Sequence, residues 1–119
     1  MSAQLSTVFP TEANARNEYP LADGLLYYFP NALAAVAKVS VAGNKQHNLG
    51  PLHWARDKST DHANKILRHL VDAGTVDTDG TLHSAKIAWR ALALLEDELI
   101  QAGATPGRNV RGEPPKYSE

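Results

Sequence analysis

Residues 59–83, STDHANKILRHLVDAGTVDTDGTLH, constrain the fold more than any other stretch of the sequence. Their apolar residues recur at the i, i+3, i+4, i+7, i+8 spacing of an amphipathic helix. These residues are Ala63, Ile66, Leu67, Leu70 and Val71. We predict a helix that buries this face and turns its charged and imidazole side chains outward. Ser59 or Thr60 is expected to cap the helix, and Gly74 suits the position just past its end.

A second, longer helix is predicted from about residue 81 to 102, after the short loop 75–80. Its expected buried stripe is Leu82, Ala85, Trp89, Leu92, Leu95 and Leu99, while Glu96, Asp97 and Glu98 are expected in solvent. Because the connection is short, the two helices should pack antiparallel. That arrangement brings His83 and Lys86 close to His69 and Asp72.

An earlier helix is predicted from Pro30 to about Ala42, with Gly43 and Asn44 ending it. A long polar loop, residues 44–58, then leads to the central helix. A loop of this length in a small domain is more often functional than accidental. The alternative is a surface loop that is pinned by Trp54 in the core.

The whole chain of 119 residues is expected to form one all-α domain, a small bundle of three to four helices. Residues 1–20 read as a flexible N-terminal segment, 21–102 as the helical domain, and 103–119 as a Gly/Pro-rich tail. A net charge of −1 implies no general attraction to nucleic acid or to a membrane surface. No apolar run is long enough to span a bilayer, and the absence of cysteine excludes disulfides and thiolate metal sites. The alanine-rich helix 31–42 offers a surface for a homo-oligomer.

Imidazoles and carboxylates are predicted to converge on the corner between the two later helices. They are His69, Asp72, Asp77, Asp79 and His83. Such a set binds a divalent cation or supplies acid–base chemistry. The alternative is structural: Asp79 caps the next helix, Asp77 satisfies loop amides, and the histidines form local hydrogen bonds.

Cationic side chains make a second candidate site, because ammonium and guanidinium groups bind phosphates. They are Lys45, Lys58, Lys65, Arg68, Lys86 and Arg90. The alternative is a set of solvated charges and surface ion pairs. Among the aromatic residues, Trp54 is the candidate for stacking on a base, whereas Trp89 lies on an apolar stripe typical of a core.

From about residue 19 to 99 the sequence resembles small phage proteins of the dATP/dGTP diphosphohydrolase N-terminal-domain family. The resemblance rests on Ala42 to Lys45, His47-Asn48, Trp54, Lys58-Ser59, Asp61-His62, Arg68-His69-Leu70, Gly74, Asp77, His83 and Ala88 to Leu92. It implies an all-α fold, a phage protein in the cytoplasm of an infected bacterium, and a nucleotide-type ligand. More distant MazG-like pyrophosphatases hold magnesium with paired acidic residues on two helices, a quartet that this sequence lacks.

Two functions follow from the resemblance together with these residues. The first is an enzyme, a diphosphohydrolase of deoxynucleoside triphosphates, with His69, Asp77 and His83 as catalytic residues and Mg²⁺ or Mn²⁺ held by Asp72, Asp77 and Asp79. The predicted ligand-binding residues are Asn44, Lys45, His47, Trp54, Lys58, His62, Lys65, Arg68 and Lys86. The second is a non-catalytic sponge that sequesters a nucleotide-derived signal of host defence, of cyclic or ADP-ribose type. Both functions remain open at this point.

Overall fold

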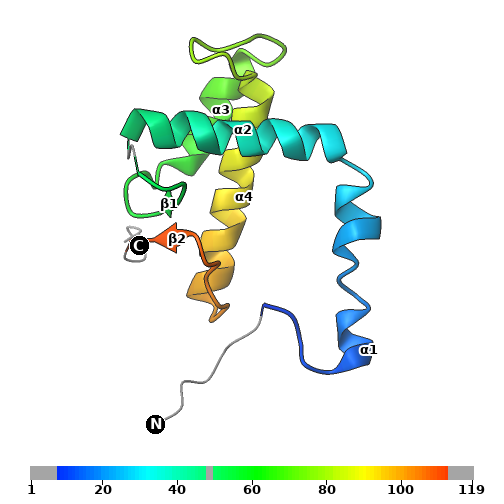
Figure 1. The fold of residues 1–119 in the computed structure, drawn as a ribbon. Helices are drawn as coiled ribbons and strands as arrows, with labels where there is room; N and C mark the ends of the chain where they lie inside the picture. The colour runs from blue at the N-terminus through cyan, green and yellow to red at the C-terminus, as the bar shows by residue number, and fades with distance from the viewer. Residues whose placement is uncertain (1–7, 48–49, 113–119) are drawn as a thin grey trace.

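The computed structural model describes residues 8–47 and 50–112 (Figure 1). Its helices are α1 (Ala13–Arg16), the π-helical η1 (Ala22–Leu26), α2 (Pro30–His47), α3 (His62–Val71) and α4 (His83–Gln101). The strands are β1 (Trp54–Ala55) and β2 (Val110–Arg111). Within the described residues the domain is therefore mostly helical, with five helices and one two-stranded sheet. The all-α prediction is right about the helices but misses the sheet.

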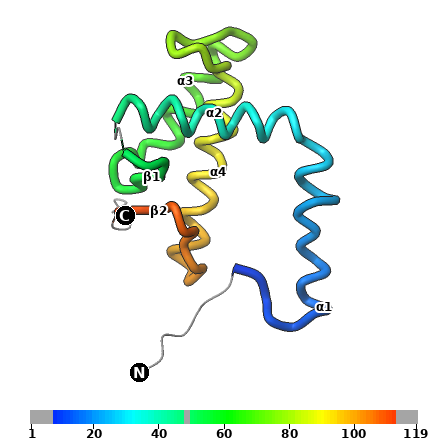
Figure 2. Tube along the Cα trace, in the orientation of Figure 1, coloured from blue at the N-terminus to red at the C-terminus, as the bar shows by residue number. Residues whose placement is uncertain are grey.

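Helices α3 and α4 pack against each other as an antiparallel pair, and α2 crosses α4 (Figures 1 and 2). The crossing is fixed by Trp89 on α4, whose Nε1–H donates to Ser40 Oγ on α2 at 2.9 Å. The ring of Trp54 meets that of Trp89 edge to face, with centroids 5.9 Å apart, a favourable arrangement for two aromatic rings. Trp54 therefore joins β1 to the helices, as in the pinned-loop alternative.

The two strands pair in parallel, with Trp54 opposite Val110 and Ala55 opposite Arg111. The Trp54 amide donates to the carbonyl of Asn109 at 2.8 Å. Two predictions are corrected by this pairing: the loop 44–58 contains a strand, and residues 103–112 are not a tail without structure. Residues 113–119 of the predicted tail lie outside the described part of the chain.

Helix α2 does not stop at residue 42 but continues to His47 through Gly43 and Asn44. A glycine inside a helix costs about 1 kcal/mol relative to alanine, which tertiary packing readily offsets. Asn44 is half-buried, and its Nδ2 donates to the carbonyl of Gly50 at 2.9 Å. The polar loop is correspondingly shorter than predicted.

The burial of α3 is the reverse of the prediction. The exposed fractions of Leu67, Leu70 and Val71 are 61%, 56% and 85%, whereas those of His62 and His69 are 2% and 9%. Helix α4 shows the same reversal at Leu92, Leu95 and Leu99, which are 50%, 53% and 48% exposed. Among the described residues only Ala85 and Ala93 are buried hydrophobic side chains. The contact between α3 and α4 is therefore polar, and the leucine stripes face outward.

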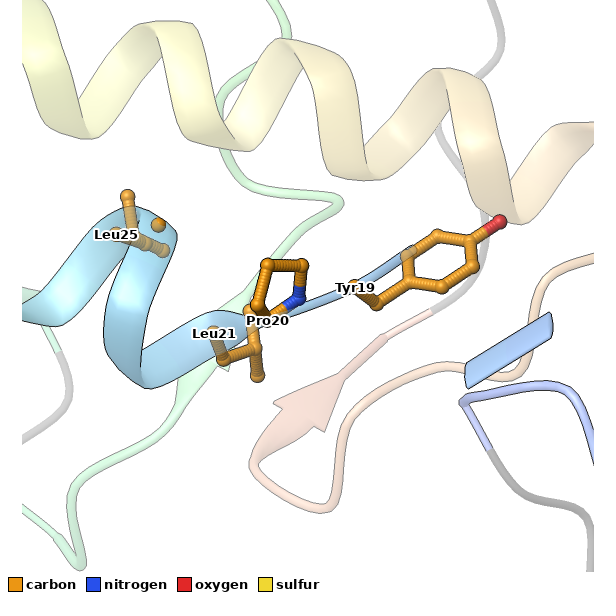
Figure 3. A pocket seen from close by; sticks show the side chains of 5 residues that line it. Tyr19, Pro20, Leu21 and Leu25 are labelled. Atoms are coloured by element: carbon orange, nitrogen blue, oxygen red, sulfur yellow. The ribbon is translucent and has the colours of Figure 1, made fainter. Parts of the chain in front are cut away.

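The segment before α2, residues 8–29, runs away from the start of α2 as a separate arm (Figure 1). Glu12 caps α1 by accepting hydrogen bonds from the amides of Asn14 and Ala15. A hollow lined by Tyr19, Pro20, Leu21, Gly24 and Leu25 lies along this arm, as Figure 3 shows. The described helices include none that is long and apolar enough to cross a membrane. Residues 1–7 of the segment predicted to be flexible lie outside the described residues.

Candidate functional site in the seam between α3 and α4

The polar contact between α3 and α4, here called the seam, has a seven-residue period on both helices. His62 and His69 are seven residues apart on α3, and His83, Arg90 and Asp97 are spaced by seven on α4. Residues at this spacing lie on one side of a helix and face a packed neighbour. Because the helices are antiparallel, His69 meets His83 at one end and His62 meets Asp97 at the other.

Three metal-ligating side chains meet at the first end. His69 Nδ1 lies 2.8 Å from His83 Nδ1, and Asp77 Oδ2 lies 3.8 Å from the same His83 nitrogen. One donor atom from each of the three residues lies within 4.8 Å of the others. The convergence predicted for these three residues is therefore confirmed.

The connection between the helices folds back so that Asp77 reaches this corner. The Asp77 amide donates to the carbonyl of Thr81 at 2.8 Å, and the His83 amide donates to the carbonyl of Thr75 at 3.1 Å. Gly74, just past α3, has a φ of 91°, a left-handed conformation that glycine adopts without strain. The reversal that Gly74 permits thus places Asp77 beside the start of α4.

Lys86 lies between two carboxylates at the edge of the corner. Its Nζ is 2.6 Å from Asp77 Oδ2 and 2.9 Å from Asp79 Oδ2. The hydrogen bond from Lys86, supported by the Thr78 amide, lowers the pKa of Asp77 to about 2. The hydrogen bonds from Thr81 and Lys86 lower the pKa of Asp79 as well. Burial acts to lower the pKa of Lys86, but the two carboxylates outweigh it and the pKa is raised.

A lowered pKa favours the neutral form of His69, which is the form that a metal ligand requires. Burial is the main cause of its lowered pKa, and the positive charge of Arg68 and the neighbouring His83 act in the same direction. Two imidazole nitrogens with one carboxylate suit Mn²⁺, Fe²⁺ or Zn²⁺ better than Mg²⁺, which prefers oxygen ligands. His69 Nδ1 and His83 Nδ1 lie 2.8 Å apart, and the three residues make a possible metal-binding group.

The predicted metal set of Asp72, Asp77 and Asp79 is only partly brought together with the two histidines. Asp77 belongs to the metal-ligating group of the described residues, but Asp72 and Asp79 do not. Asp72 is exposed at the end of α3. Asp79 accepts hydrogen bonds from the amide and hydroxyl of Thr81 and does not cap α4, which begins after Leu82.

A buried ionic group occupies the other end of the seam. Asp97 is 0% exposed, and Oδ1 accepts a hydrogen bond from Arg56 Nε at 2.9 Å while Oδ2 lies 3.2 Å from His62 Nε2. Arg56 Nη2 is also 2.9 Å from Oδ1, as a charge contact without hydrogen-bonding geometry. Asp97 was predicted to lie in solvent, and Arg56 falls within the predicted polar loop 44–58, where no role was predicted for it. The seven-residue spacing from His83 through Arg90 is the signal that marks Asp97.

Cations gather in the middle of the seam. Ser59 does not cap α3: its Oγ accepts hydrogen bonds from Lys65 Nζ at 2.6 Å and from Arg90 Nη1 at 2.9 Å. His62, Lys65 and Lys86 from the predicted ligand-binding set therefore lie in the seam, and Arg68 lies on the same helix close enough to lower the pKa of Lys65. Arg90, which was not placed in that set, belongs to this cation group.

The other predicted ligand-binding residues lie elsewhere. They are Asn44, Lys45, His47, Trp54 and Lys58, from the end of α2 and the segment around β1. In the described part of the chain, no hydrogen bond or ion pair of their side chains reaches the seam. Trp54 in particular is half-buried and packs edge to face on Trp89, so it has a packing role, and its role in base stacking stays a prediction.

The fold and the site together define a small helical protein whose polar centre lies between two antiparallel helices. The family whose model matches is described as dATP/dGTP diphosphohydrolase, N-terminal, and the match covers residues 11–106. The chain therefore belongs to this family, as the resemblance implied. No curated protein and no solved structure matches the chain.

Proposed function

We propose that this protein binds a deoxynucleoside triphosphate at the seam and hydrolyses it with the help of a divalent metal ion. The observation that carries the proposal is the group of His69, Asp77 and His83, whose donor atoms lie within 4.8 Å of one another. The family to which the chain belongs is associated with hydrolysis of such nucleotides. The setting would be the cytoplasm of a phage-infected bacterium.

The metal-ligating corner and Lys86 would contribute to this reaction in different ways. A metal ion bound by His69, Asp77 and His83 would supply Lewis acidity and lower the pKa of a water molecule. Lys86 neutralises phosphate charge beside that corner, as a cation near the transferred group must. The overall reaction consumes one water and gives a nucleoside monophosphate and pyrophosphate.

The first experiment measures the metal site directly, by calorimetric titration of metal-free protein with Mn²⁺ and with Mg²⁺. We expect Mn²⁺ to bind more tightly than Mg²⁺, because two of the three donors are imidazoles. Asp77→Asn should weaken Mn²⁺ binding at least tenfold, because it removes the only charged ligand. Unchanged Mn²⁺ affinity in this variant would remove the metal from the proposal.

Lys86→Met provides the matched comparison. Lys86 Nζ already binds the Asp77 oxygen that faces His83, at 2.6 Å. A metal ion must therefore compete with this ammonium group. We expect Lys86→Met to bind Mn²⁺ more tightly than the wild type, whereas Lys38→Met, an exposed change on α2, should leave the affinity unaltered.

A second candidate function, a sponge that sequesters a nucleotide-derived signal without chemistry, is favoured by the same Lys86 contact. The ammonium group satisfies Asp77 and Asp79, and His69 and His83 lie at hydrogen-bonding distance from each other. Each carboxylate and imidazole of the corner thus has a partner within the protein, so the corner does not need a metal ion to satisfy it. Incubation with nucleotides and cyclic nucleotides, with and without Mn²⁺, separates the two functions by chromatography. Metal-dependent monophosphate indicates the enzyme, and ligand recovered unchanged after heating indicates the sponge.

We further propose that the working form is a homo-oligomer in which a second copy covers the outward leucine stripes of α3 and α4. The helix 31–42, for which this role was predicted, already packs partly on α4 through Ser40. The leucine stripes, by contrast, carry large apolar side chains that are about half exposed. Large apolar side chains that are exposed along one face of a helix are typical of interaction surfaces.

A further inference from the structure

We propose that Ser59, Lys65 and Arg90 form a binding pocket for a phosphate group, with Arg68 adding to its positive charge. The pocket would hold the phosphate chain of the nucleotide, and this assignment of the anion rests on the proposed function. It is distinct from the His69–Asp77–His83 corner, and phosphate recognition there requires no metal.

The hydrogen bonds within the pocket occupy its acceptor atom, so the groups that remain for a ligand are all hydrogen-bond donors. Ser59 Oγ accepts from Lys65 Nζ at 2.6 Å and from Arg90 Nη1 at 2.9 Å. A hydroxyl oxygen has two lone pairs, so both are used and its O–H remains free to donate. Lys65 and Arg90 each keep further N–H groups. A site that offers several donors and no acceptor suits an oxyanion.

The charges of the pocket are not balanced by a carboxylate ion pair. Among the described residues, none of the ion pairs includes Lys65, Arg68 or Arg90. Burial and the positive charges of the neighbouring residues lower the pKa of both Lys65 and Arg90. Asp61 opposes this effect, but it is exposed and accepts a hydrogen bond from Asn64. The ligand-free protein therefore carries like charges in close proximity, and a phosphate dianion would relieve their repulsion.

The buried group at the end of the seam holds Arg90 in place. His62 Nε2 lies 3.2 Å from Asp97 Oδ2, and His62 Nδ1 lies 3.4 Å from Arg90 Nη1. The contacts fit a tautomer that donates to Asp97 and accepts from Arg90. The Arg90 guanidinium also sits 5.3 Å from the ring of Trp89. Arg90 is thus oriented before a ligand arrives, which reduces the entropy cost of binding.

The pocket and the metal corner are far enough apart to be tested separately. His83 and Arg90 are seven residues apart on α4, a rise of about 10 Å along the axis. A single phosphate group held by Arg90 therefore does not reach the metal-ligating nitrogens. Phosphate binding that is measured without metal and weakened by Lys65→Met therefore reports on this pocket rather than on the metal-ligating corner.

The test is a calorimetric titration of the full chain, in a chelator that removes divalent metals, with pyrophosphate, dATP and deoxyadenosine. We expect pyrophosphate and dATP to bind and deoxyadenosine not to bind. Lys65→Met should weaken pyrophosphate and dATP at least tenfold, because it removes a charged hydrogen bond to phosphate. Lys38→Met, which removes an exposed lysine on α2, should change neither affinity by more than twofold.

Thermal unfolding provides a second test, because a purely structural role of Lys65 predicts a lower melting temperature for Lys65→Met and ligand binding predicts a higher one. Lys65→Met relieves repulsion with Arg90 and Arg68, so the melting temperature of the ligand-free protein should rise by about 1–2 °C while phosphate binding falls. Arg90→Lys keeps the charge but loses the fork of donors, and it should bind pyrophosphate more weakly than the wild type. Pyrophosphate affinity that is unchanged in both variants would overturn the proposal, as would a wild type that binds neither pyrophosphate nor dATP. Neither result would depend on whether the metal corner is active.

Discussion

The seam between α3 and α4 and the outward faces of the same two helices contrast sharply. The seam contains histidines, a buried aspartate and a cluster of cations, whereas the outward faces carry most of the leucines. In a water-soluble helix the usual arrangement is the opposite. The difference teaches that this domain buries a polar seam and leaves its apolar stripes exposed, which is the basis of our proposal that a second copy covers them.

At the Asp97 end of the seam, the burial of charged side chains is tolerated because these charges are paired. Burying an isolated carboxylate costs several kcal/mol, and the contacts of Arg56 and His62 with the two oxygens of Asp97 offset that cost. The outward stripes need no such compensation, but they gain little from folding of a single chain.

The largest effect is expected at the buried carboxylate. Asp97→Ala leaves the Arg56 guanidinium buried without its counter-charge, which should lower the free energy of unfolding by about 3–5 kcal/mol. Urea denaturation followed by circular dichroism measures this change. Glu98→Ala, at the exposed neighbouring position, should change it by less than about 0.5 kcal/mol. Similar effects of the two variants would mean that the seam is not the stabilising interior.

The next effect concerns the leucine stripe of α4. Combined Leu92→Glu and Leu95→Glu should dissociate the proposed oligomer, because each carboxylate would be buried in an apolar contact. Sedimentation velocity should show the wild type as a dimer or larger and this variant as a monomer with unchanged helix content. A double change on the outer side of α2, Ala34→Glu with Lys38→Glu, serves as the control and should keep the wild-type assembly. A wild type that sediments as a monomer would contradict this role of the outward faces.

The smallest effect is a dependence of stability on pH through His69. Since burial lowers its pKa below the ordinary 6.5, the folded state favours the neutral imidazole. Its contribution to stability is present above about pH 6.5 and is lost as the pH falls through the lowered pKa of the folded protein. Asp77, with a pKa of about 2, acts in the same direction only below about pH 4.

Melting temperatures between pH 7.5 and 5.5 measure this contribution. We expect a modest fall in the wild type and a smaller fall in His69→Gln, which cannot take up the proton. Equal falls in the two proteins would show that other histidines are responsible. The same range of pH should weaken Mn²⁺ binding, because a protonated imidazole cannot coordinate a metal ion.

Part of the candidate site could be predicted from local patterns in the sequence. The short connection after α3 implied an antiparallel pair, and this places His69 beside His83 as predicted. Asp77 follows from the same loop, and the family that the sequence resembles is the one whose model matches residues 11–106. Asp97 and Arg56 were missed because a carboxylate next to two glutamates, and an arginine in a loop, both look like solvated charges.

The sequence by itself determined where α3 and α4 lie and that each has a polar and an apolar face. These properties depend on residue spacing along one helix, which is a local quantity. Only the tertiary structure decided which face is inside, because that choice depends on whether the charges find partners from distant segments. Arg56 and Asp97 are separated by 41 positions yet pair at 2.9 Å, and that contact makes a polar interior stable. The packing of the helices thus buries polar faces that the sequence pattern alone would place in solvent.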